Sequence, residues 1–305
     1  MTLTDALKAT DRSLKSLNLA TLRTGVRVGA VVAPQRTAHA VAQRFFRTEK
    51  PALARMRFQH QKPVIGTMPV PDGSITTYRF GEVGRQPTAL LVHGWNGWAQ
   101  QLERFVAPLQ ERGYAVLAFD HVAHGLSDGE RTTLPSMIRS IERVLGEVSN
   151  VTAVVAHSLG AAAVASVLSS TRRELDGAVL IAPPSDPRPY LRMLARMLGA
   201  PKHLMPHIQE AAERTAGVPF ARLVADPWLA RRVRTPLMIV HDVTDEEVPI
   251  SNGYVYANAT QARVLVTDGL GHRRILRDLH VVEASSNFVA RRGPAPERAR
   301  LAIAA

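Results

Sequence analysis

The chain has no cysteine among its 305 residues. Disulfide bonds, a cysteine nucleophile and metal sites ligated by cysteine are therefore excluded. Aromatic residues make up only 5% of the chain, and no stacking platform for bases, zinc finger or helix-turn-helix pattern occurs. No apolar run approaches the length of a membrane-spanning helix. Because hydrophobic residues still account for 46% of the chain, it can bury the core of one large α/β domain with an insertion, or of two domains.

Acidic residues are outnumbered by basic ones, and the formal net charge is +12. An excess of this size can indicate nucleic acid or an anionic membrane surface as a partner. The basic residues, however, are nearly all arginines and are spread along the chain. We attribute the excess to a compositional bias toward arginine and expect no nucleic-acid partner.

The first 61 residues precede the regular patterns of the chain, and we expect them to form a helical extension. Between Arg12 and Thr48 there is no acidic residue, and leucines near the start have roughly helical spacing. Three interpretations stay open: an arm that binds a membrane or a partner, a transit-like peptide, or an extension whose apolar stripe packs on the core, which we favour. The apolar run at 26–34 contains Arg27 and no convincing cleavage site follows it. We therefore expect no secretory signal and a cytoplasmic location.

Strand and helix patterns alternate through the rest of the chain. Apolar, β-branched runs predict strands, and longer runs with helical spacing predict the helices between them. The expected strands cover residues 64–70, 75–80, 88–93, 114–120, 151–156, 178–182, 236–241 and 262–268, and the expected helices cover 98–112, 132–147, 161–168 and 273–291. A Pro-Asp-Gly turn at 71–73 joins the first two strands as a hairpin. The later alternation indicates a mostly parallel sheet flanked by helices.

Ser158 lies at the apex of a turn between the strand at 151–156 and the helix at 161–168. The turn reads Ala156-His157-Ser158-Leu159-Gly160. Small residues on both sides of the serine let the strand and the helix pass close to each other, and a strained turn lifts the hydroxyl clear of the sheet. A serine in such a loop is often only a turn or capping residue. The strand before it and the helix after it favour a nucleophile instead.

This turn resembles the nucleophile elbow of the α/β-hydrolase family, with Ala156 where the common pattern has its first glycine. The resemblance covers residues 62–292 and implies an α/β-hydrolase fold. It further implies a core at 62–183 and 233–292, a helical cap at 184–232, and an esterase- or lipase-like serine hydrolase. The tail at 293–305, which has two prolines and several charges, is expected to be disordered.

The family carries its catalytic acid and its base after later strands, in the chain order serine, acid, histidine. The Val-Pro pair at 248–249 resembles the end of the family's acid turn and aligns Asp245 with the acid, with Asp242 and Glu246 as rivals. His272 follows the last expected strand, in a loop with two glycines, and is aligned with the base. A serine hydroxyl needs a base, and the base needs an orienting group. The expected catalytic residues are therefore Ser158, Asp245 and His272.

The resemblance also implies two backbone amides that stabilise an oxyanion. One is the amide of Leu159, directly after the nucleophile, and the other is most naturally the amide of Trp95, after the His-Gly pair at 93–94. The remaining histidines of these turns are expected to be structural; they are His93, His121, His124 and His157. Because no histidines have the spacing of metal ligands, we expect neither a metal nor another cofactor.

We therefore expect an enzyme that cleaves a small-molecule carboxylic ester through an acyl-enzyme. Leucines, methionines and a tyrosine share one face of residues 190–198, which would roof the pocket over an apolar acyl or alcohol part, or else form the packing core of the cap. A serine nucleophile excludes the usual dehalogenases and epoxide hydrolases, which use a carboxylate. Two alternatives remain: an acyltransferase or thioesterase on the same residues, and a non-catalytic binding protein that keeps the fold.

Overall fold

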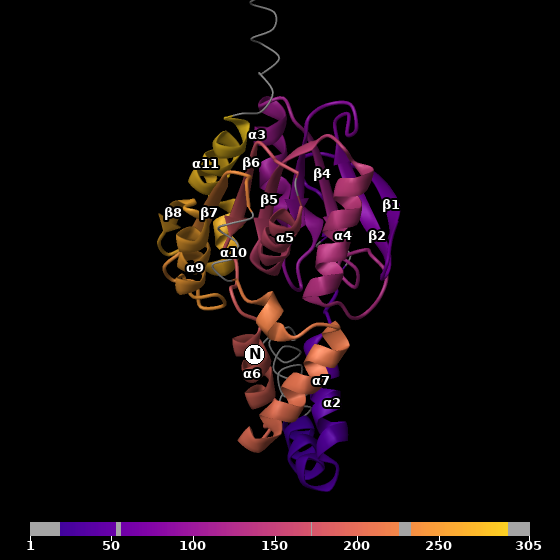
Figure 1. The fold of residues 1–305 in the computed structure, drawn as a ribbon. Helices are drawn as coiled ribbons and strands as arrows, with labels where there is room; N and C mark the ends of the chain where they lie inside the picture. Colours follow the sequence, from indigo (N-terminus) through magenta and orange to yellow (C-terminus); the bar gives the residue numbers. More distant parts are fainter. Residues whose placement is uncertain (1–18, 53–55, 172, 226–232, 292–305) are drawn as a thin grey trace, which may run out of the picture. The chain divides into compact units, whose positions relative to one another are not determined.

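The computed structural model describes residues 19–52, 56–171, 173–225 and 233–291 (Figure 1). The tail expected at 293–305 lies outside the described residues. The chain divides into two compact units. The core unit contains Thr48–Asp186 and the residues from Leu223 onward, and the helical unit contains the residues up to Arg47 together with Pro187–Arg222. Within the described ranges, every helix is too short or too polar to span a bilayer.

The core unit is built on one sheet, which has eight strands among the described residues. They are β1 (Val64–Val70), β2 (Gly73–Phe80), β3 (Thr88–Val92), β4 (Ala115–Asp120), β5 (Val151–His157), β6 (Gly177–Ile181), β7 (Leu237–Asp242) and β8 (Arg263–Thr267). Their order across the sheet is β1-β2-β4-β3-β5-β6-β7-β8. Strand β2 pairs antiparallel with β1 and β4, and the other neighbours pair parallel. Each expected strand is present to within two residues at either end, and the expected mostly parallel sheet is confirmed.

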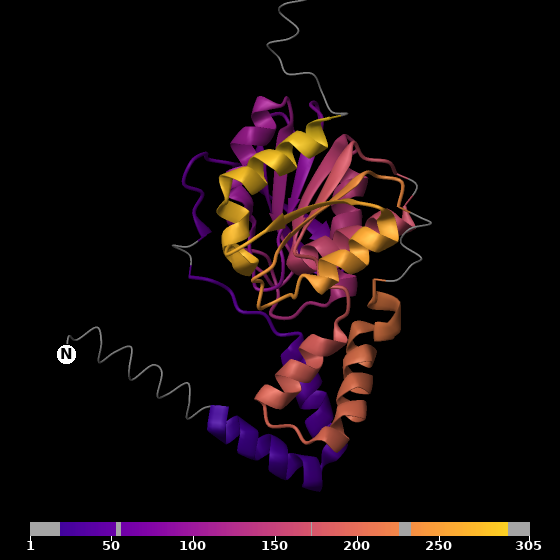
Figure 2. The same cartoon turned by 90° about the vertical axis from the view of Figure 1, so that its left-hand side faces the viewer.

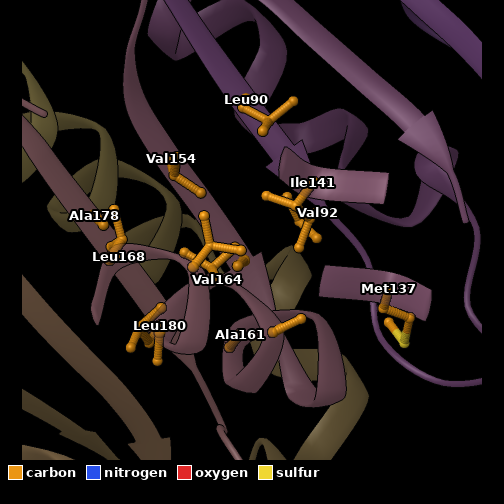
Figure 3. Packing of buried hydrophobic residues seen from close by; sticks show 14 of the residues in the cluster. Leu90, Val92, Met137, Ile141, Val154, Ala161, Val164, Leu168, Ala178 and Leu180 are labelled. Carbon is orange, nitrogen blue, oxygen red and sulfur yellow. The ribbon is translucent and has the colours of Figure 1, made fainter. Parts of the chain in front are cut away.

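Helices cover both faces of this sheet (Figure 1). They are α3 (Val106–Glu111), α4 (Leu134–Glu147), α5 (Ser158–Ser170), α9 (Ser251–Thr260), α10 (Gly271–Arg274) and α11 (Leu279–Ala290), with 3₁₀ turns η2 (Ala99–Phe105) and η5 (Ile275–Arg277). Successive side chains of a strand point to opposite faces. Leu90 and Val92 of β3 share one apolar cluster with Ile141 of α4 and Val164 of α5 (Figure 3). Leu91 lies in a second cluster with residues of η2, α3 and α11. Burial on both faces explains why the central strands are continuous apolar runs.

Two of the expected helices differ from those observed. The segment at 98–112 begins as the 3₁₀ turn η2 and continues as α3, and Gly113, with φ of 85°, follows its end as expected. The single helix expected at 273–291 is divided into α10, η5 and α11, so that prediction was wrong. The break lies at Asp278, whose backbone is extended and whose side chain accepts a hydrogen bond from the Val281 amide at 3.0 Å. Asp278 therefore caps α11 and cannot continue the preceding turn.

The helical unit joins two stretches that are far apart in the sequence. Its elements are helical backbone over 19–32, α2 (Pro34–Phe45), α6 (Arg188–Met197), η3 (Lys202–Leu204), α7 (Met205–Ala216) and the start of η4 (Phe220–Leu223). Helix α2 lies along α7 (Figure 2), where Gln43 donates a hydrogen bond to Thr215 at 2.9 Å and the ring of Phe45 lies 6.5 Å from that of Phe220. The N-terminal helices thus pack with the helices inserted between β6 and β7, as one unit rather than as two separate segments.

The apolar face expected over 190–198 is divided in the helical unit. Leu191 and Leu198 are buried, and Tyr190 and Leu194 are partly buried, whereas Met197 is 49% exposed. Most of this face therefore contributes to the packing of the helical unit itself.

Candidate active site

Ser158 is the first residue of α5 and directly follows the end of β5. Its φ is 52°, a left-handed conformation that residues other than glycine rarely adopt. Backbone strain of this kind costs about 1–3 kcal/mol and persists only where the surroundings enforce it. The turn therefore has the strained geometry that the sequence predicts for a nucleophile elbow.

Close contacts around this turn require small residues. A Cβ atom on Gly160 would lie 2.2 Å from the carbonyl oxygen of His93, and one on Gly94 would lie 2.6 Å from Cβ of Ser158. Cβ atoms do not approach other atoms so closely, so glycine is needed at both positions. Ala156 is fully buried in the apolar core, and its methyl group fits where the common pattern has glycine.

The structure brings the three expected catalytic side chains into one hydrogen-bonded chain. Nε2 of His272 lies 2.9 Å from Oγ of Ser158, and Nδ1 of His272 lies 2.7 Å from Oδ2 of Asp245. With its proton on Nδ1, the ring donates to the carboxylate and leaves Nε2 as the acceptor for the serine hydroxyl. The residues come from the carboxyl ends of β5, β7 and β8, which lie at one edge of the sheet.

Asp245 is buried, and the backbone of its own loop fixes its carboxylate. Oδ1 accepts hydrogen bonds from the amides of Glu247 at 2.9 Å and Val248 at 2.8 Å, so Oδ2 is the oxygen that faces His272. His241 lies 3.6 Å from the same carboxylate but donates from Nε2 to the carbonyl of Val248 at 2.8 Å. Burial lowers the pKa of His241, so its ring is neutral.

The rival acids occupy other places. Glu246 is exposed. Asp242, at the end of β7, is buried and accepts hydrogen bonds from the Thr244 amide and hydroxyl at 3.0 and 2.5 Å, the Thr267 hydroxyl at 2.7 Å and the Leu270 amide at 3.0 Å. Burial alone would raise the pKa of Asp242, but hydrogen bonds from both threonines and from the loop amides outweigh it and lower the pKa. Asp242 therefore shapes the loop that carries His272.

His157 supports the same loop from the end of β5. Its Nε2 donates to the carbonyl of His272 at 2.9 Å, and the two ring centroids lie 4.6 Å apart. Burial, and after it the neighbouring His272, keep the pKa of His157 well below 6.5, so its ring is neutral. The sequence analysis expected only a structural role here. It could not identify the contact, because the two residues are separated by 115 positions.

The loop after β3 folds back on itself beside the serine. The carbonyl of Gly94 accepts hydrogen bonds from Nδ1 of His93 at 2.8 Å and from the amide of Gly97 at 3.0 Å. In a trans peptide the C=O and N–H groups point in opposite directions, so the Trp95 amide points away from these two donors. The Leu159 amide lies in the first turn of α5, where helix amides have no acceptor within the helix. Both expected oxyanion donors therefore belong to segments that adjoin the serine.

Three buried histidines, His93, His121 and His124, pack together beside the loop after β3. The ring of His93 lies 4.8 Å from that of His121 and 5.1 Å from that of His124. Nε2 of His93 accepts from the His121 amide at 3.0 Å, and Nε2 of His124 accepts from the Asn96 amide at 3.1 Å. Burial lowers the pKa of His93 to about 4, and burial together with repulsion from His93 lowers that of His124 to about 3. In the described ranges, no three His, Cys, Asp or Glu side chains are arranged to hold a metal ion.

Asp120, at the end of β4, is a buried carboxylate that the sequence analysis did not single out. It accepts hydrogen bonds from the Ala99 amide at 2.7 Å, the Tyr78 hydroxyl at 2.7 Å and the Leu126 amide at 2.9 Å. Gly125, with φ of 47°, passes so close that a Cβ there would lie 2.0 Å from the carboxylate. Burial raises the pKa of Asp120 despite these hydrogen bonds. The only signal for this buried carboxylate in the sequence is the spacing of Asp120 and Gly125, five positions apart.

Comparison with known proteins supports an α/β-hydrolase fold. A family model described as serine aminopeptidase, S33, matches residues 85–244. No curated protein matches the chain significantly. Among solved structures, the esterase Pf2001 of Pyrococcus furiosus is 18% identical, with a TM-score of 0.59 over 82% of this chain and 98% of that one. Est1E of Butyrivibrio proteoclasticus, solved with ferulic acid bound, is 19% identical, with a TM-score of 0.59 over 74% and 98% of the two chains. The esterase RhEst1 of a Rhodococcus species is 20% identical, with a TM-score of 0.56 over 75% and 99%.

Replacing Asp242 with Asn is expected to lower the free energy of unfolding at neutral pH. The NH₂ group of the asparagine would replace an acceptor oxygen and would face the amide and hydroxyl donors that now bind the carboxylate. The folded pKa of Asp242 lies below its ordinary value of 3.8. Its carboxylate therefore stabilises the fold above that pH, and this contribution is lost as the pH falls further. Urea unfolding at pH of about 7, 5 and 3.5 should show the difference from wild type shrinking at the lowest pH.

The matched control is Asp268→Asn, which changes an exposed carboxylate of the loop after β8. It should leave the free energy of unfolding nearly unchanged. A destabilisation by Asp242→Asn that stays constant across this pH range would contradict the assignment of Asp242 as a stabilising carboxylate.

Proposed function

Because the chain belongs to the serine aminopeptidase S33 family of α/β hydrolases, we propose that it cleaves carboxylic esters through an acyl-enzyme on Ser158. One observation carries the proposal: the hydrogen-bonded chain from Ser158 through His272 to Asp245, with the serine held in a left-handed turn. These are the groups that turn a weakly nucleophilic hydroxyl into a strong one.

The reaction begins when Oγ of Ser158 attacks the ester carbonyl and its proton moves to Nε2 of His272. Asp245 stabilises the imidazolium that forms and keeps the ring in its orientation. The carbonyl oxygen becomes an oxyanion, which accepts hydrogen bonds from the amides of Trp95 and Leu159. Nε2 of His272 then returns the proton to the departing alcohol, and the acyl group stays on the serine.

Water completes the cycle. His272 removes a proton from a water molecule, which attacks the acyl-enzyme, and the second tetrahedral intermediate uses the same two amides. The collapse of this intermediate releases the carboxylic acid and restores the Ser158 hydroxyl. The neutral state of His157 favours this cycle, because a permanent positive charge beside His272 would oppose formation of the imidazolium.

An ester with an apolar acyl or alcohol part is the substrate class we propose. The two oxyanion amides belong to Trp95 and Leu159. Both residues have large apolar side chains, and both side chains are only partly buried. Two structures similar to this chain, Pf2001 and RhEst1, are described as esterases, and a third, Est1E, was solved with ferulic acid bound. The family description names peptides as another substrate class, which makes the amide bond the reaction to compare.

A thioesterase or acyltransferase is the second candidate, because a thioesterase domain from the curacin biosynthetic pathway is also similar in structure, at 16% identity and a TM-score of 0.55. The acyl-enzyme would be the same, and only the leaving group or the group that accepts the acyl chain would differ. Partition of the acyl group between water and an added alcohol or thiol separates these functions from ester hydrolysis.

Treatment with a fluorophosphonate is expected to add one phosphonyl group to Ser158. The reagent reports an activated serine without requiring the natural substrate. Intact mass and peptide mapping measure the adduct, which should be absent in Ser158→Ala and unchanged in Ser170→Ala, at the exposed end of the same helix. Thermal unfolding should confirm that both variants fold. An adduct on any other serine would discard Ser158 as the nucleophile.

Replacing Asp245 with Asn is expected to lower kcat for a soluble ester by roughly three to four orders of magnitude, because Nδ1 of His272 loses its anionic acceptor. Glu246→Gln, one position further in the same loop and exposed, should leave kcat within about two-fold of wild type. Equal activity of Asp245→Asn and wild type would remove Asp245 from the mechanism.

The substrate class is tested with two chromogenic esters that share one leaving group and with one chromogenic amide. The kcat/KM for p-nitrophenyl butyrate is expected to exceed that for p-nitrophenyl acetate by about ten-fold, since added methylenes gain contacts in an apolar pocket. It should also exceed that for alanine p-nitroanilide, whose amine leaves less readily. Background rates come from Ser158→Ala. Faster cleavage of the anilide would contradict the ester assignment and favour a peptidase.

A further inference from the structure

The positive charge of the chain is concentrated in the helical unit. Its described residues include eleven basic side chains, at positions 23, 27, 36, 44, 47, 188, 192, 196, 202, 214 and 222, and two acidic ones, Glu210 and Glu213. The difference is nine positive charges, against +12 for the whole chain. The excess arises because only two acidic residues accompany eleven of the chain's 38 basic residues in this part of the unit.

Large apolar side chains are exposed beside these charges. Val28, Val31 and Val32 are 58%, 81% and 78% exposed. With 100° between successive residues of a helix, the three lie within an arc of about 100° on the outer side of the helix at 19–32. The buried Ala30 lies on the opposite side and packs inward. Isolated exposed valines are common on protein surfaces, but three on one helix face form a stripe.

Helix α6 of the same unit also carries exposed apolar and basic side chains. Nε of Arg23 donates a hydrogen bond to the carbonyl of Met197 at 2.8 Å, so the end of α6 lies against the helix at 19–32. Met193 and Met197 are 54% and 49% exposed, and Arg196, which lies between them in the sequence, is exposed as well. We call the exposed side chains of Arg27, Val28, Val31, Val32, Arg196 and Met197 the basic apolar surface.

We propose that the basic apolar surface binds the face of an anionic phospholipid membrane. Aliphatic side chains can enter the boundary between head groups and acyl chains, while arginines at the same level bind the phosphates. In the described part of the unit, the two carboxylates leave little repulsion from an anionic surface. Nucleic acid fits less well, because the four aromatic residues of the unit's described part, Phe45, Phe46, Tyr190 and Phe220, are buried or partly buried, and none forms an exposed stacking platform.

Vesicle flotation of the full-length protein tests this proposal independently of catalysis. The vesicles contain phosphatidylcholine alone or phosphatidylcholine with about 30% phosphatidylglycerol. We expect binding to the anionic vesicles at low salt and weaker binding at about 0.5 M NaCl, because salt screens the electrostatic attraction. Hydrolysis of a soluble ester, measured in parallel, reports the separate proposal about Ser158.

Two variants test the apolar and the basic side chains of the surface separately, and each has a matched control on the core unit. Val28→Ser/Val31→Ser/Val32→Ser removes apolar contact and is matched by Val64→Ser/Ile65→Ser on the edge strand β1, where both side chains are exposed. Arg27→Glu/Arg196→Glu reverses two charges and is matched by Arg85→Glu/Arg104→Glu, which are exposed and make the same change in net charge. Thermal unfolding checks that each variant folds.

Both variants of the surface are expected to lower the vesicle partition coefficient by about ten-fold or more, and both controls by less than about two-fold. No binding of the wild-type protein to anionic vesicles would overturn the proposal. Equal losses in variants and controls would also overturn it, because they would indicate attraction by net charge alone. Tight binding of an RNA or DNA oligonucleotide by a wild-type protein that leaves vesicles unbound would assign the surface to nucleic acid instead.

Discussion

At Ser158 the backbone is left-handed, with φ of 52°, and this conformation must be held against strain by the packing around it. The packing consists of strand β5 and helix α5, both almost entirely buried, and of the loop after β3. Gly160 lets α5 approach the carbonyl of His93, and Gly94 lets the same loop approach Ser158. One set of close contacts therefore positions the Ser158 hydroxyl and the neighbouring amides that are expected to bind an oxyanion. A larger side chain at either glycine would displace both.

The other members of the site depend on buried carboxylates that follow strands. Asp120, Asp242 and Asp245 are all buried, and each accepts at least one hydrogen bond from a backbone amide of the loop after its own strand. A buried carboxylate is costly unless such donors satisfy it, so each loop has one favoured conformation. Asp245 differs from Asp242 in that one of its oxygens is left facing His272. The same chemical group thus fixes loop geometry in one case and orients an imidazole in the other.

The sequence was sufficient to predict the strands, the mostly parallel sheet and the three side chains that meet at its edge. The strands and the sheet follow from local patterns of apolar, β-branched runs, whereas Ser158, Asp245 and His272 were identified through the resemblance of their turns to those of the α/β-hydrolase family. Helix α9 was not predicted, because its sequence has a glycine, two asparagines and no clear apolar stripe. Gly253 is needed there because a Cβ would lie 2.5 Å from Nδ1 of His241, a contact between separate elements that no local pattern records. The association of α2 with α7 was not predictable for the same reason, since the residues that meet lie about 170 positions apart.

The electrostatics of the site depend on burial as much as on the charged residues. Burial holds the pKa of His93 at about 4 and that of His124 at about 3, so neither ring is charged near neutral pH. Each ring then keeps an unprotonated Nε2, which accepts a hydrogen bond from the backbone at His121 or Asn96. Protonation would convert these acceptors into donors and break the contacts that fix the loop carrying the Trp95 amide. Under the proposed mechanism, the buried neutral rings favour a site in which preorganised backbone dipoles, rather than free charges, stabilise the oxyanion.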